Sequence, residues 1–116
     1  MGSREGLLRK KPAALVTLYR AIEVALAGYE DVEIVAKDRY ALFRTTRIFA
    51  DLVFMRDALR LAVHVKRAVS DPLFFKVVAG RNGQVTHVAK IRDAAELDAV
   101  MPYLKEAYEV ARGESQ

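Results

Sequence analysis

Residues 48–66 read IFADLVFMRDALRLAVHVK and predict two antiparallel strands joined by a tight turn. Alternate residues of the second strand are apolar, which predicts one buried face: Leu59, Leu61, Val63 and Val65. If Arg56 and Asp57 form the turn, each of these four opposes an apolar residue of the first strand: Phe54, Leu52, Ala50 and Ile48. A slip of one residue would turn one apolar set to the wrong face, so the pattern predicts this register.

Further segments with a period of two lie on both sides of this hairpin. They are residues 32–36, 40–44, 74–79 and 84–91. Asn82-Gly83 separates the last two segments and suits a two-residue hairpin turn, because both positions tolerate positive φ. The faces of this last pair stay open, since either alternation leaves Lys76 or Lys90 among apolar neighbours.

Two amphipathic helices enclose the strands in the sequence. Apolar residues at three- and four-residue spacing predict one helix between Pro12 and Gly28. A second is predicted from Asp93, a capping residue, to Gly113, with Pro102 inside it. The predicted fold class is α+β, a single meandering antiparallel sheet of about five to six strands packed against an N-terminal and a C-terminal helix.

The chain has 116 residues, enough for one domain with its own core. We expect this domain to span residues 8–112, with residues 1–7 and 113–116 as flexible termini. The absence of cysteine excludes disulfides and thiolate metal sites and fits the cytoplasm, a reducing compartment. No apolar run approaches the roughly 20 residues that cross a bilayer, so we expect no membrane partner.

Several short motifs resemble those of an uncharacterised prokaryotic family. The motifs are Arg47-Ile48-Phe49-Ala50-Asp51-Leu52, Leu59-Arg60-Leu61 with Val63, Asp71-Pro72, Ala95-Glu96-Leu97-Asp98 and Glu106-Ala107-Tyr108-Glu109. The similarity runs from about Leu8 to Ala111. Members are labelled as domains of unknown function, some of them as predicted transport proteins. They occur alone or as C-terminal additions to larger proteins, some of which resemble restriction nucleases. The resemblance implies a fold and brings no established active residues.

Charge is segregated along the chain. From Lys37 to Arg92, twelve Lys or Arg residues accompany four acidic residues, a net charge of +8. The residues after Arg92 carry a net charge of −4. A basic middle segment attracts anions, including nucleic acid.

The other face of the central hairpin carries the candidate binding residues. The predicted register places Phe49 beside His64 on this face, and Arg47 beside Lys66. Three uses compete for it: self-association as a homodimer, nucleic-acid binding in which Phe49 stacks on bases, or an ordinary solvated surface. The candidate nucleic-acid or anion-binding residues are Arg44, Arg47, Phe49, Arg60, His64 and Lys66.

The sequence contains no Walker loop, no His-Glu-x-x-His helix and no Gly-x-Ser-x-Gly turn. Only His64 with Asp51 suggests a small-molecule or hydrolytic enzyme, the weakest of our hypotheses. We therefore predict a binding or accessory domain that contacts nucleic acid or another anionic partner and uses no metal or cofactor. The alternative is a structural homodimer or protein–protein interaction module without a nucleic-acid role.

Overall fold

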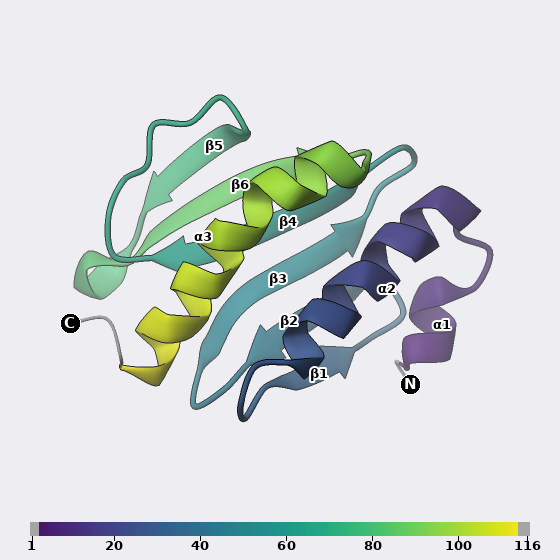
Figure 1. The fold of residues 1–116 in the computed structure, drawn as a ribbon, viewed down its shortest axis with the longest axis horizontal. Helices are drawn as coiled ribbons and strands as arrows, with labels where there is room; N and C mark the ends of the chain where they lie inside the picture. Colours follow the sequence, from purple (N-terminus) through teal and green to yellow (C-terminus); the bar gives the residue numbers. More distant parts are fainter. Residues whose placement is uncertain (1–2, 114–116) are drawn as a thin grey trace.

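A computed structural model describes residues 3–113, which form one antiparallel sheet with helices on one side (Figure 1). The helices are α1 (Arg4–Leu8), α2 (Ala13–Ala27), the short 3₁₀ helix η1 (Arg81–Gly83) and α3 (Ala94–Arg112). The strands are β1 (Glu33–Ala36), β2 (Tyr40–Arg44), β3 (Ile48–Phe54), β4 (Leu59–Val65), β5 (Phe74–Ala79) and β6 (Val85–Ile91). Their order across the sheet is β1-β2-β3-β4-β6-β5. The predicted α+β class is confirmed, and β6 rather than β5 lies beside β4.

The ends of the long helices follow their sequence signals. The Asp93 carboxylate accepts a hydrogen bond of 2.9 Å from the backbone N–H of Glu96, which caps the start of α3. Gly113 ends α3 with φ 78°, a left-handed conformation that glycine adopts without a Cβ clash. The helix is continuous through Pro102. Between these caps its buried face packs on β3, β4 and β6.

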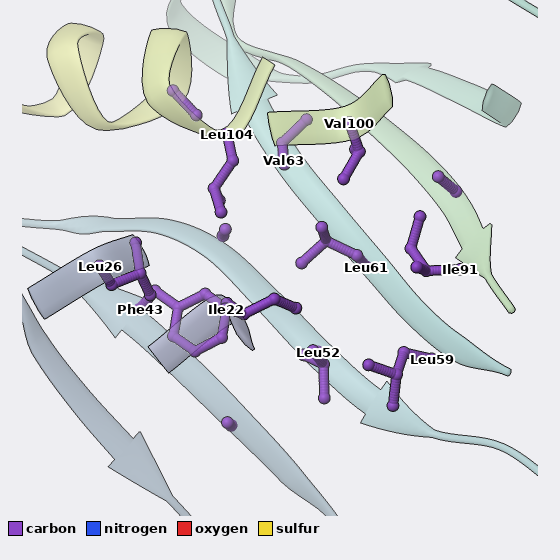
Figure 2. Close-up of a cluster of buried hydrophobic side chains, with 14 of the residues drawn as sticks. Ile22, Leu26, Phe43, Leu52, Leu59, Leu61, Val63, Ile91, Val100 and Leu104 are labelled. Carbon is purple, nitrogen blue, oxygen red and sulfur yellow. The ribbon is translucent and has the colours of Figure 1, made fainter. Parts of the chain in front are cut away.

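The register of the central hairpin is confirmed from Ala50 opposite Val63 to Phe54 opposite Leu59. The predicted buried face of β4 is also confirmed, because its four apolar residues are each at most 1% exposed: Leu59, Leu61, Val63 and Val65. Figure 2 shows Leu59, Leu61 and Val63 of this row together with core residues of the two long helices, including Ile22 of α2 and Leu104 of α3. The core therefore lies between one sheet face and two helices.

A β-bulge in β3 changes the direction of two side chains. Phe43 pairs with Ala50 and Arg44 pairs with Ile48, so Phe49 is an extra residue on its strand. Phe49 consequently points into the core and is 1% exposed, whereas Ile48 is 41% exposed. The predictions that Phe49 lies on the open face of the sheet and that Ile48 opposes Val65 on the buried face were wrong, because they assumed a strict alternation along this strand.

A second bulge lies in β5. Phe74 pairs with Ala89 and Lys76 pairs with Val88, which leaves Phe75 as the extra residue. Phe74 is therefore buried on the helix side, while Lys76 points to the opposite side. Lys90 also points away from the helices, because it pairs with Arg60 of β4. Because of the bulge, Lys76 and Lys90 can both point away from the helices, which answers the question of faces that the sequence did not decide for this hairpin.

Part of the N-terminal segment that we expected to be flexible is helical. Leu7 of α1 is fully buried, and the Arg4 guanidinium donates two hydrogen bonds of 2.8 and 2.9 Å to the Glu23 carboxylate of α2. Residues 1–2 and 114–116, also expected to be flexible, lie outside the described residues. Within residues 3–113, no helix has both the length and the apolar composition needed to cross a membrane.

Candidate functional site

One face of the sheet is open. Helices α2 and α3 both lie on the near side of the sheet in Figure 1, with α2 over its β1–β2 end and α3 over β3, β4 and β6. The opposite side, which we call the outer face, carries no helix among residues 3–113. Side chains of the outer face are therefore available to solvent or to a partner.

Strand pairing arranges the outer face in three rows that cross the strands. The first row contains Tyr40, Val53, Arg60 and Lys90. The second row contains Leu42, Asp51, Ala62, Val88 and Lys76. The third row contains His64, Thr86 and Val78. Neighbouring strands lie about 4.8 Å apart, so the second row measures about 14 Å from Asp51 to Lys76.

The centre of these rows is a shallow hollow of about 280 Å³. Its floor is formed by Ala62 and Val88, which are 4% and 3% exposed. The longer side chains of Asp51, Arg60 and Lys76 stand around this floor. A hollow of this size suits a single small chemical group, such as one ring of a larger ligand, rather than a whole drug-sized molecule.

Two cations, Arg60 and Lys76, line the hollow, and Lys90 lies next to Arg60 in the first row. None of the three has an acidic partner within residues 3–113. Arg60 and Lys90 are direct cross-strand neighbours, an arrangement in which like charges repel. The Lys90 ammonium lies 5.3 Å from the ring centre of Phe75, which is 53% exposed. An anion bound here would relieve the repulsion.

Asp51, His64 and Thr86 form a polar array beside the cations. His64 Nδ1 lies 2.9 Å from the Thr86 hydroxyl oxygen, and His64 Nε2 lies 3.7 Å from Asp51 Oδ2. If the hydroxyl donates to Nδ1, the Nε2–H of a neutral His64 points toward the carboxylate. The array has the residue types of a nucleophile, a base and an acid, and the strands that carry it, β3, β4 and β6, are paired with their neighbours in the sheet.

The residues predicted for binding do not form a single surface. Arg60 and His64 lie on the outer face as expected. Arg44 lies there too, with Nε 3.9 Å from the Glu33 carboxylate of β1. Phe49 lies on the helix side, where its ring packs edge-on against Tyr108 with 5.7 Å between the ring centres. Phe49 is therefore part of the core.

Arg47 and Lys66 lie at one end of the sheet. Arg47 Nη2 donates a hydrogen bond of 3.2 Å to the Val110 carbonyl near the end of α3. Lys66 Nζ donates one of 2.8 Å to the Asn82 carbonyl. Both residues line a separate hollow of about 360 Å³ beside the C-terminus of α3. Neither of them borders the central hollow of the outer face.

His87 is the second histidine, and its role is structural. It is fully buried, its Nε2 accepts a hydrogen bond of 2.9 Å from the Val69 N–H, and its Nδ1 lies 3.2 Å from the Val85 carbonyl. Burial lowers the pKa of His87 below the ordinary value of 6.5. Among residues 3–113 no cluster of three or more His, Asp or Glu side chains is placed to hold a metal ion.

A prediction about pH follows from the burial of His87. The unfolded chain takes up a proton on this residue near pH 6.5, while the folded chain resists it. Its contribution to stability is therefore complete above about pH 6.5 and is lost as the pH falls toward the lowered value. The urea midpoint of the wild type should decline more steeply from pH 7 to pH 5 than that of His87→Gln. Equal declines would contradict a buried neutral histidine.

The structure thus defines a small α+β domain with one open, basic sheet face. The chain belongs to the family described as "Domain of unknown function (DUF5655)", whose model matches residues 5–111. Searches of curated proteins and of solved structures find no match to the chain. The family match includes all six strands, so the whole outer face lies within the family domain.

Proposed function

We propose that this domain binds single-stranded nucleic acid across the outer face and catalyses no reaction. The observation that carries the proposal is a set of three cations that have no acidic partner within residues 3–113, Arg60, Lys76 and Lys90, with the exposed ring of Phe75 beside Lys90. Lys and Arg supply affinity for phosphates, and an exposed ring on a flat sheet offers a stacking surface for bases. Stacking of this kind requires bases that are not paired in a duplex, which favours single strands.

The charge of the strands also supports a polyanionic partner. The segment from Lys37 to Arg92, which contains β2 to β6, carries a net charge of +8. A basic segment of this kind attracts the phosphates of nucleic acid.

A homodimer formed through the outer face is the second candidate. Exposed apolar residues on this face favour it, since Tyr40, Ile48 and Val78 are 40%, 41% and 45% exposed. A twofold contact over the hollow would, however, bring the unpaired cations of two copies together. Sedimentation at high protein concentration distinguishes the two candidates, because a monomer is compatible only with the nucleic-acid proposal.

Fluorescence anisotropy with a mixed-sequence single strand of about 12 nucleotides tests the proposal. Contacts from three cations should give a slope of about −2 for log K against log salt, because each phosphate contact on a single strand contributes about 0.7. The double variant Arg60→Glu/Lys76→Glu should bind at least about tenfold more weakly, since two attractions become repulsions.

The matched control is Arg20→Glu/Lys105→Glu, which makes the same change of charge on the helix side. Both control residues are exposed, and the control should retain most of the affinity of the wild type. Thermal melts of both variants should stay close to that of the wild type, because none of the four side chains belongs to the core. Absence of binding at low salt, or an equal loss in both double variants, would refute a site on the outer face.

A further inference from the structure

We infer that Asp51 reads the edge of a base in the hollow and gives the outer face a preference for bases that carry an exocyclic amino group. This inference rests on the proposed function. Asp51 is the one acid in the three rows of the outer face, and its side chain is 31% exposed. A carboxylate on a phosphate-binding surface weakens phosphate binding. Any favourable contribution of Asp51 to binding must therefore come from a contact with a group of the ligand other than phosphate.

The Asp51 carboxylate has acceptor capacity to spare. The nearest basic group to it among residues 3–113 is His64 Nε2 at 3.7 Å, which is beyond hydrogen-bonding distance. Arg60, two residues from Ala62 along β4, forms no ion pair with it. The carboxylate also lines the hollow, so its oxygens are accessible to a ligand in that space. An ionised carboxylate accepts hydrogen bonds and donates none.

The geometry separates the acceptor from the two lysines, whereas Arg60 lines the same hollow as Asp51. Lys76 ends the second row about 14 Å from Asp51, with Lys90 in the adjacent row. A single strand of nucleic acid that crosses these rows can place its phosphates near the two lysines and turn a base toward the Asp51 carboxylate. The hollow of about 280 Å³ lies between Asp51 and Lys76 and accommodates the ring of a base. His64 is a positioning residue, because its contact with Thr86 at 2.9 Å fixes the ring beside the carboxylate.

Base chemistry then sets the preference. Cytosine presents an N4 amino group, a donor that aspartate and glutamate side chains recognise. Thymine has a carbonyl oxygen at the corresponding position, which repels a carboxylate. Cytosine and thymine are both single rings, so a comparison between them separates hydrogen bonding from ring size. The wild type should bind oligo-dC more tightly than oligo-dT, by at least about fivefold.

Asp51→Asn tests this inference, with the ratio of oligo-dC to oligo-dT affinity as the readout. The loss of a negative charge should strengthen binding to both strands, whereas the new amide N–H₂ can donate to the thymine carbonyl, so the ratio should fall toward one. Glu33→Gln is the control, because it removes an acid of β1 that contacts Arg44, and it should leave the ratio unchanged. Asp51→Ala, which has no acceptor, should also lose the preference.

The outcomes distinguish the inference from the proposed function. If neither strand binds at low salt, the proposed function fails. If both strands bind equally to the wild type, or if Asp51→Asn keeps the ratio of the wild type, the domain binds nucleic acid but Asp51 does not read the base. Thermal melts of each variant show that the comparison uses folded protein.

Discussion

Replacing Phe49 with alanine is expected to lower the free energy of unfolding by about 3 to 5 kcal/mol, as measured by urea denaturation. The ring is 1% exposed and packs against Tyr108 of α3 with 5.7 Å between the ring centres, so its removal leaves a cavity between the sheet and the helix. The folded fraction of this variant should bind single strands with the affinity of the wild type, because the ring points away from the outer face.

Phe75→Ala is the matched control. We expect it to change stability little and to weaken the binding of single strands, the opposite of Phe49→Ala. Its ring is 53% exposed, so the free energy of unfolding should change by only about 0.5 kcal/mol. Affinity for single strands should fall by about 1 to 3 kcal/mol if the ring stacks on a base. A stable Phe49→Ala variant that has lost its affinity for single strands would instead place Phe49 on the outer face and contradict the bulge in β3.

Leu61→Ala is expected to lower the free energy of unfolding by about 2 to 5 kcal/mol. Leu61 is fully buried on β4, where it pairs with Leu52 on one side and Ala89 on the other. The cavity would lie at the centre of the core, beneath the residues of α2 and α3 drawn in Figure 2, where the sheet cannot readily collapse to fill it. Val24→Ala on the solvent side of α2 is the control, since Val24 is 75% exposed. A wild-type urea midpoint for Leu61→Ala would contradict the assignment of faces on β4.

The register of β3 and β4 could be predicted because the paired part of this hairpin contains no bulge. Its pattern stays regular from Ala50 to Phe54 and from Leu59 to Val63, and local alternation is then sufficient. The ends of α3 could also be predicted, because the capping interactions at Asp93 and Gly113 involve only neighbouring residues.

The two bulges could not be predicted from alternation. Phe49 turns inward and contacts Tyr108, and the 58 residues between them in the sequence hide this contact from any local pattern. Of the residues proposed to bind, Arg60 and His64 could be placed on the outer face from the sequence, because they lie on the regular strand β4. Lys76, Lys90 and Phe75 were missed, although the failure of either alternation to fit their hairpin was itself a signal of a bulge.

The side chains of the outer face lie at fixed distances from one another, both along the strands and across them. Side chains on one face repeat about every 6.7 Å along a strand and about every 4.8 Å across the strands, and backbone hydrogen bonds maintain both distances. A ligand therefore meets groups whose backbone positions are set before it arrives, and it orders only the ends of a few long side chains. Much of the entropy that a loop-built site loses on binding is lost here during folding. An extended ligand fits this face when the spacing of its own groups matches the spacing of the side chains. A ligand with a different spacing would contact fewer of them and bind more weakly.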